Sequence, residues 1–119
     1  TVTFNQAVPF ADVRVLEYSG LSTTAAFDKA LGNSGSGTTA SAGLTTASAN
    51  ELVFAAAMTG GVINSAGSGF QLRIQTPDGD IGEDELAAAT GSYTATAPVT
   101  PYAGTSTWVM QVAAFKAAP

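Results

Sequence analysis

Five of the nine acidic residues of this chain fall within eight positions, from Asp78 to Glu85. Carboxylates beside a glycine-containing turn can wrap a calcium ion, which takes about six to eight oxygen ligands. The Asp-x-Asp spacing begins like the calcium loop of a helix-loop-helix protein, but Gly82 and Ala89 stand where further ligands are needed. Two interpretations stay open: a solvated turn whose aspartates cap backbone amides, or a calcium site. The ligands of that site would be Asp78, Asp80, Glu83 and Asp84.

Aromatic side chains are the second group that could bind a ligand, because an exposed ring on a β-sheet protein can serve as a platform for a sugar. Tyr102 follows Pro101 in a predicted loop and is the best placed of them. Tyr93 and Trp108 are the other candidates. The competing interpretation is that Trp108 belongs to the core or to an interface, since large aromatic residues are mostly buried.

The residue types needed for most catalytic sites are missing. The chain has no Cys and no His, which excludes a cysteine nucleophile, a thiolate zinc site, a disulfide and the usual general base. The remaining enzymatic hypothesis pairs Glu17 with Asp84 or Glu85 for glycoside hydrolysis, although a domain of this size offers little room for a substrate cleft. Alternatively, Glu17 lies buried in a strand and pairs with Arg73. We predict no enzymatic activity and, apart from calcium, no cofactor.

Charge and composition exclude other classes of partner. The net charge is −5, and Lys and Arg are not clustered, so neither nucleic acid nor an anionic membrane is an expected partner. The longest apolar run, residues 52–58, is too short to cross a bilayer, and we predict no membrane insertion. Only 11% of the residues are charged, against roughly 25% in an ordinary soluble domain. Together with abundant Thr, Ser, Gly and Ala, this composition favours an extracellular or cell-surface location.

Strand patterns that could position these residues run along most of the chain. The clearest alternation is at residues 70–76, where Phe70, Leu72 and Ile74 should face inward. Residues 77–80 form a turn because Pro fixes φ and Gly supplies a positive φ. A short helix is possible only at residues 21–31, with Gly32 as its end. The predicted strands are residues 1–4, 13–18, 51–58, 70–76, 85–90 joined to or followed by 92–97, and 107–116, with a weak strand within 38–46.

About seven short strands with turn signals between them, and at most one short helix, predict an all-β fold: a two-sheet antiparallel β-sandwich of the jelly-roll or immunoglobulin-like kind. The last strand is apolar on both faces and should therefore be central. The 119 residues predict one domain. Because the chain begins with Thr at a strand pattern, we expect a processed product or an excised piece, and leave open whether another chain or fragment completes it.

Four segments carry a resemblance to a known kind of module: LEYSG at 16–20, TPDGDIGEDEL at 76–86, GSYTATAP at 91–98 and WVMQVAAFK at 108–116. They resemble a β-sandwich module that recurs in large secreted or surface proteins of environmental bacteria, often beside fibronectin-type or immunoglobulin-like repeats. The resemblance covers nearly all of this chain but only the C-terminal part of the module, and it implies that earlier strands belong to the sandwich. It implies no catalytic pattern.

These observations predict a non-enzymatic structural or adhesive module of a bacterial extracellular protein, or a subunit of a surface assembly. If another polypeptide supplies the earlier strands, the partner of this module is a neighbouring chain whose strand adds to the edge strands. The alternative is a carbohydrate-binding module that uses the loop aromatics, with calcium at the acidic turn, and whose partners are glycans.

Overall fold

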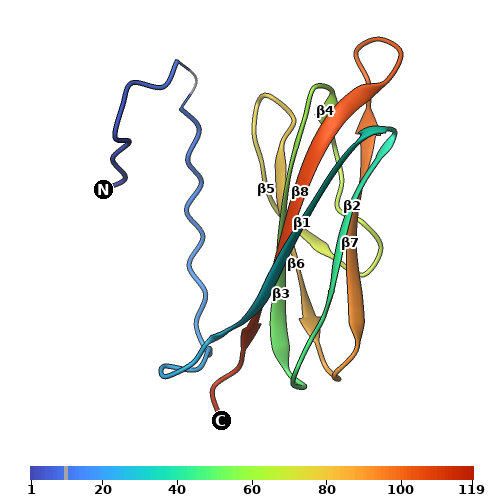
Figure 1. Cartoon of the computed structure of the whole chain (residues 1–119). Coiled ribbons are helices and arrows are strands. Elements are labelled where there is room, and N and C mark those ends of the chain that lie inside the picture. Colours follow the sequence, from blue (N-terminus) through green and yellow to red (C-terminus); the bar gives the residue numbers. More distant parts are fainter. Residues whose placement is uncertain (10) are drawn as a thin grey trace.

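The structure is a computed structural model that describes residues 1–9 and 11–119, and this part of the chain is all-β. Its eight strands form two antiparallel sheets packed face to face (Figure 1), which confirms the predicted two-sheet sandwich. The described part has no helix, and so none that could cross a membrane. The strands are β1 (Phe27–Gly37), β2 (Thr39–Thr45), β3 (Glu51–Thr59), β4 (Val62–Ile63), β5 (Gln71–Gln75), β6 (Ile81–Ala87), β7 (Ser92–Thr100) and β8 (Ser106–Lys116).

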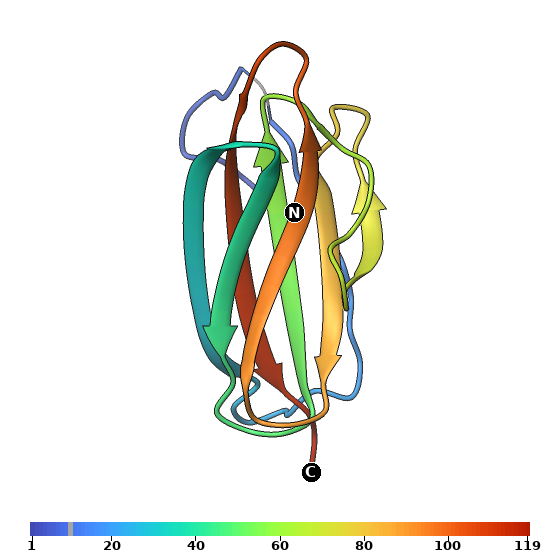
Figure 2. The same cartoon turned by 90° about the vertical axis from the view of Figure 1, so that its right-hand side faces the viewer.

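The larger sheet has the order β1-β8-β3-β6-β5, and the smaller sheet has the order β2-β7-β4. The last strand, β8, lies between β1 and β3, as its apolar residues on both faces predicted. The smaller sheet has only three strands and does not cover the whole inner face of the larger one. Figure 2 shows that the segment between β4 and β5 runs across the uncovered side.

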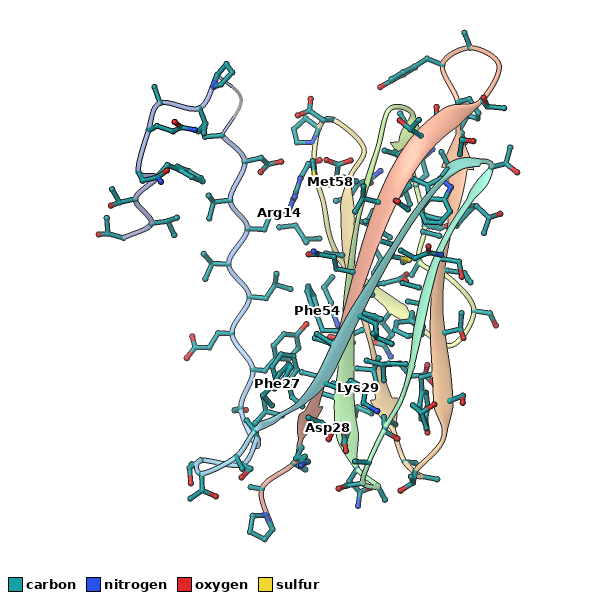
Figure 3. The ribbon with its side chains drawn as sticks, viewed as in Figure 1. Arg14, Phe27, Asp28, Lys29, Phe54 and Met58 are labelled. Carbon is teal, nitrogen blue, oxygen red and sulfur yellow. The ribbon has the colours of Figure 1, made fainter. Side chains whose placement is uncertain are left out.

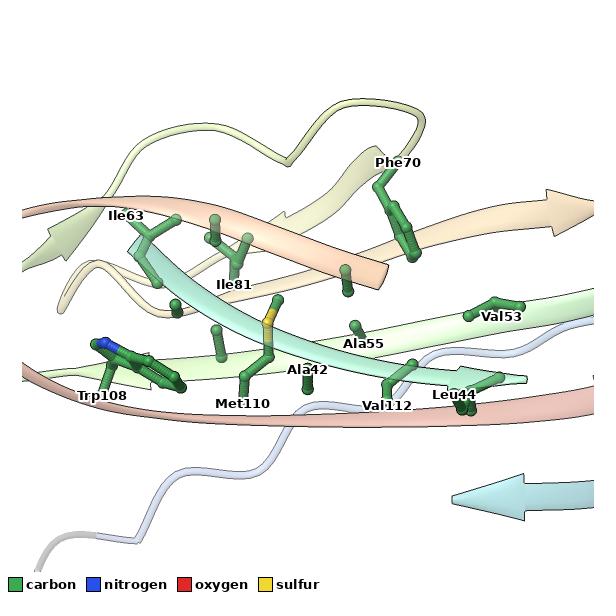
Figure 4. Close-up of a cluster of buried hydrophobic side chains, with 14 of the residues drawn as sticks. Ala42, Leu44, Val53, Ala55, Ile63, Phe70, Ile81, Trp108, Met110 and Val112 are labelled. Carbon is green, nitrogen blue, oxygen red and sulfur yellow. The ribbon is translucent and has the colours of Figure 1, made fainter. Parts of the chain in front are cut away.

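The core lies between the sheets and is built largely from small side chains. Alanines of β2, β3, β7 and β8 are buried at the contact between the layers, so the sheets approach closely. Larger side chains fill the ends and the spaces between them (Figure 4). The largest apolar side chains that are completely buried are Ile63, Ile81, Met110, Val53 and Val112.

The short helix that was possible at residues 21–31 does not form. Ser22 Oγ instead accepts weak hydrogen bonds from the backbone amides of Thr24 and Ala25, at 3.4 and 3.3 Å, in a tight turn. Strand β1 begins at Phe27, whose ring makes an edge-to-face contact with Phe115 at a centroid distance of 6.2 Å. Pairing along the full length of β8 outweighs the local helix propensity of this segment.

Two predicted strands, residues 1–4 and 13–18, are not part of either sheet within the described chain. Residues 11–19, which we call the strap, are extended but run beside the larger sheet as a separate segment (Figure 1). The strap joins the sandwich at Leu21, which pairs with Ala117 after β8. For residues 13–18 the sequence pattern therefore predicted the extended conformation correctly and the sheet pairing incorrectly, and residues 1–4 do not form the predicted strand.

In the acidic segment, the turn lies where it was predicted, but strand β6 begins earlier than predicted. The turn at residues 77–80 is confirmed: Gly79 has a φ of +87°, and a Cβ there would lie 2.8 Å from Val62 Cα. Only glycine fits such a position, which combines a positive φ with close approach of the backbone. However, β6 begins at Ile81 rather than at Glu85, so most of the acidic cluster lies in a strand.

The predicted inward face of residues 70–76 is only partly correct. Phe70 is buried in the core, whereas Leu72 is 39% exposed. The pairing register of β5 shifts between Leu72 and Ile74, which places Ile74 opposite Gly82. A β-bulge of this kind interrupts the two-residue period on which the prediction depended.

Candidate interaction site on the outer face of the larger sheet

The outer face of the five-stranded sheet is apolar, although it points away from the core. Along β3 the outward residues alternate with the core residues and are all hydrophobic: Leu52, Phe54, Ala56 and Met58. Leu52 is only 5% exposed, but Met58 at the other end of the strand is 59% exposed. This face is therefore covered at one end and open at the other.

The strap lies over this face with alternating orientation. Leu16 and Tyr18 are partly buried on the side toward the sheet, whereas Val13 and Val15 are 48% and 82% exposed. Within the described part of the chain, no backbone–backbone hydrogen bond involves residues 11–19. The strap is thus an extended segment with free donors and acceptors along its length.

Tyr18 and Asp84 fasten the strap to the sheet. The Tyr18 hydroxyl donates to Asp84 Oδ2 at 2.7 Å, and Arg73 Nε donates to the same oxygen at 2.7 Å. Asp84 is 2% exposed, so its charge is balanced by a guanidinium and a phenol rather than by water. Partial burial, together with the hydrogen bond to Asp84, raises the pKa of Tyr18 to about 12. The Tyr18 ring also packs edge-to-face on Phe54, with centroids 6.2 Å apart.

A second contact lies toward the other end of the strap. Arg14 forms an ion pair with Asp80 at 3.6 Å and a hydrogen bond with its neighbour Asp12. Asp80 also accepts a hydrogen bond from the Thr59 amide at 3.0 Å, which fixes its side chain at the end of β3. Two polar contacts therefore hold the strap at a defined position above the apolar face.

A groove of about 540 Å³ lies between the strap and the sheet. Its walls include Leu16 and Tyr18 of the strap and, on the sheet, Phe54, Ile74 and Phe115. A further hollow of about 360 Å³ shares Phe54 with the groove and extends over β8 and β1. Figure 3 shows Arg14 directed toward the sheet and Phe54 directed toward the strap.

The predicted calcium ligands do not come together. Asp78 is exposed in the turn, Asp80 is bound to Arg14, Glu83 faces the interior and Asp84 faces the strap. Adjacent residues of a strand point to opposite faces, which separates the last two. Among residues 1–9 and 11–119, no cluster of three acidic side chains could hold a metal ion. The acidic run is therefore divided among separate environments, and Asp80 and Asp84 bind protein groups.

Glu83 lies in the most enclosed of these environments. It is fully buried, and its Oε2 accepts a hydrogen bond from the Gly67 amide at 2.9 Å. Its Oε1 is buried without a hydrogen-bond partner in the described part of the chain. Burial raises the pKa of Glu83 to about 7, although the Gly67 hydrogen bond lowers it in part.

The predicted sugar-binding aromatics are also separated. Trp108 is 9% exposed and belongs to the core, where its ring packs against Gly35. Tyr93 is half-buried and donates to the Ala89 carbonyl at 2.8 Å. Tyr102 alone is strongly exposed, at 74%, in the loop between β7 and β8. A platform of several rings is therefore not formed by these three residues.

The expected pairing of Glu17 with Arg73 is wrong. Glu17 is exposed on the outward side of the strap, and Arg73 binds Asp84 instead. The hydrogen bond to Asp84 is the main cause that raises the pKa of Arg73 further. The carboxylate pairs considered for glycoside hydrolysis are not brought together either, because Asp84 lies beneath the strap and Glu85 faces the interior.

Sequence reasoning missed Arg14 and Tyr18 as the residues that hold the strap. The signal was present, since both lie on the same side of the alternating segment as Leu16 and are the polar members of that side.

Comparison with known proteins finds no matching family model, no matching curated protein and no matching solved structure.

Proposed function

We propose that this chain is a non-enzymatic structural and adhesive module of an extracellular or cell-surface protein, and that it works by packing another polypeptide against the strap and the outer face. The observation that carries the proposal is an extended segment with unpaired backbone groups above an apolar sheet face. Exposed apolar surface and free strand edges are the features by which β-proteins associate.

The strap is suited to accept a strand because it is already extended and held in place. A partner strand would satisfy its free N–H and C=O groups, and the alternate side chains of that strand would fill the groove. Because Tyr18 and Arg14 fix the strap beforehand, less conformational entropy is lost on association than for a free tail. The low proportion of charged residues, 11%, supports the extracellular assignment.

Sedimentation velocity across a wide range of protein concentration tests this proposal. We expect the chain to self-associate or to capture an added β-strand peptide. Val15→Lys on the strap and Met58→Lys on the outer face should each weaken association, because each places a charge on the proposed surface. Tyr102→Lys is the matched control, since it adds the same charge to an exposed residue of the β7–β8 loop. A monodisperse monomer at every concentration, with no binding of a hydrophobic dye, would overturn the proposal.

A second candidate function, carbohydrate binding, rests on the exposure of Tyr102. One exposed ring can stack on a sugar, but the other two aromatic candidates, Tyr93 and Trp108, do not form a platform with it. A glycan array with the unaltered chain and Tyr102→Ala tests this function. Binding that is lost in the variant would support it, and the absence of any glycan signal would exclude it for the sugars on the array.

A further inference from the structure

We propose that the Glu83 carboxyl is a pH-sensitive latch, which holds residues 64–70 against the sandwich while it is neutral and releases them when it ionises. This device lies in the interior of the sandwich, apart from the strap and its groove. It goes beyond the proposed function, because it concerns how the fold responds to its surroundings.

The segment held by the latch covers part of the core. Residues 64–70 connect β4 to β5 and cross the side of the sandwich that the three-stranded sheet leaves open (Figure 2). Phe70 at the end of this segment is 8% exposed and belongs to the core, and Ala66 packs against it. Release of the segment would therefore expose core side chains to water.

Gly67 is one of the points at which the segment is fixed, besides Asn64, whose Oδ1 accepts a hydrogen bond from Gln75 Nε2 at 3.1 Å. Its amide donates to Glu83 Oε2 at 2.9 Å, and a Cβ at this residue would lie 1.9 Å from the Thr96 carbonyl oxygen of β7. The segment is thus in direct contact with the smaller sheet on one side and hydrogen-bonded to the larger sheet on the other. Displacement of Glu83 removes one of these two attachments.

Among residues 1–9 and 11–119, no Lys or Arg is buried in the interior beside Glu83. On β6, Glu85 is the next residue on the same face, and Asp84 points to the other face. On β5, Arg73 is bound to Asp84; β3 contributes only Glu51, at its far end, and β7 only Tyr93. The segment 64–70 and strands β2 and β4 contain no ionisable side chain, and Lys116 of β8 pairs with Asp28.

Burial without a cation disfavours the charged form of a carboxyl group. The hydrogen bond from Gly67 compensates only one oxygen, because Oε1 has no partner among the described residues. Ionisation is therefore favoured in a state in which the segment has opened and water reaches the carboxylate. Ionisation of Glu83 in the open state therefore shifts the equilibrium from closed to open molecules.

The direction of the pH effect follows from the two pKa values. The pKa of Glu83 is about 7 in the closed state and returns to 4.5 when water reaches the group. The contribution of Glu83 to the stability of the closed state is fully present below pH 4.5. It is lost progressively up to about pH 7, above which the loss is complete. The opening constant should rise about tenfold per pH unit in this window, or about 300-fold in all.

Hydrogen exchange of the Gly67 and Phe70 amides tests the latch in the whole chain. Protection factors, corrected for the intrinsic pH dependence of exchange, should fall from pH 4.5 to 7 in the unaltered protein and then level off. Glu83→Gln keeps a hydrogen-bond acceptor but cannot ionise, so its protection factors should not change with pH in this window. Glu85→Gln, on the same strand and face, is the matched control and should behave like the unaltered protein.

A second measurement needs no variant and covers the case in which Glu83→Gln fails to fold. Carbon-13 NMR of the glutamate carboxyl groups follows Glu83 directly through its titration. A midpoint near 7, together with loss of Gly67 protection in the same range, supports the latch. A midpoint near 4.5, or an unchanged pH dependence of protection in a folded Glu83→Gln variant, overturns it.

Discussion

Two adjacent carboxylates of β6 lie on opposite faces of the same sheet and have different partners. Glu83 faces the interior, where it accepts one amide hydrogen bond and lies near no cation among the described residues. Asp84 faces the strap, where one of its oxygens accepts from both Arg73 and Tyr18. On one face burial therefore raises the pKa of a carboxyl group, and on the other face a carboxyl group accepts hydrogen bonds from two side chains.

The apolar residues of the two faces differ in the same way. The inner face is covered by the smaller sheet together with residues 64–70 and is packed with alanines, whereas the described part of the chain places the strap above the outer face and leaves a groove there. Burial without voids stabilises a fold, and apolar surface next to a groove is available for association. We infer that the inner face contributes most of the folding free energy and that the outer face serves recognition.

The two methionines of the chain give the largest expected difference between the faces. Met110 on the inner face is fully buried, and Met58 on the outer face is 59% exposed. Met110→Ala should lower the free energy of unfolding by about 3 kcal/mol, because it leaves a cavity in a packed core. Met58→Ala should change it by less than about 0.5 kcal/mol. Urea unfolding measures both, and equal effects would contradict the proposed difference between the faces.

Removal of the Asp84 charge should have the next largest effect, confined to the strap. Asp84→Asn should weaken hydrogen bonds to a charged group that contribute about 2 kcal/mol, so the strap detaches more often while the sandwich stays folded. Tryptic cleavage after Arg14 reports this release and should become up to about 30-fold faster, because every 1.4 kcal/mol corresponds to about a factor of ten. Asp78→Asn removes the same charge from an exposed turn and should leave the rate unchanged. An equal rate in both variants would show that Asp84 does not hold the strap.

The sequence predicted the sandwich correctly because its period-two patterns and turn residues are local signals. Residues 51–58 and 107–116 lie in β3 and β8 as predicted, and β8 is central. The errors come from interactions between distant residues. Phe27 is placed in a strand by Phe115, 88 positions later in the chain, and the strap is extended without being paired.

The candidate site was less predictable than the fold. The acidic cluster is obvious in the sequence, but its division between two faces depends on where β6 begins, at Ile81. A shift of one residue in the pairing register of β6 with β3 would exchange the faces of Glu83 and Asp84. The partners of Asp84 come from β5 and the strap, and no local pattern links Tyr18 to Arg73.

The alkaline titration of Tyr18 tests the contact between the strap and Asp84 on the outer face. Burial, and after it the hydrogen bond to Asp84, raises the pKa of Tyr18 to about 12, above its usual value of 10.0. The stabilising contribution of this tyrosine is therefore present below pH 10 and is lost as the pH rises to about 12. Ultraviolet titration should show the late ionisation of the Tyr18 phenol, which should be absent in Tyr18→Phe and shifted toward lower pH in Asp84→Asn. Tyr93→Phe, the control, should retain the late phenol.

The smallest effect is expected at Tyr102, which lies on neither face of the larger sheet. Its side chain is 74% exposed in the β7–β8 loop, so Tyr102→Ala should change the free energy of unfolding by less than about 0.5 kcal/mol. It should also leave self-association unchanged, because the proposed surface is formed by the strap and the outer face. Sedimentation and urea unfolding check both expectations. A variant that folds normally but no longer associates would place the interaction surface at this loop and not at the outer face.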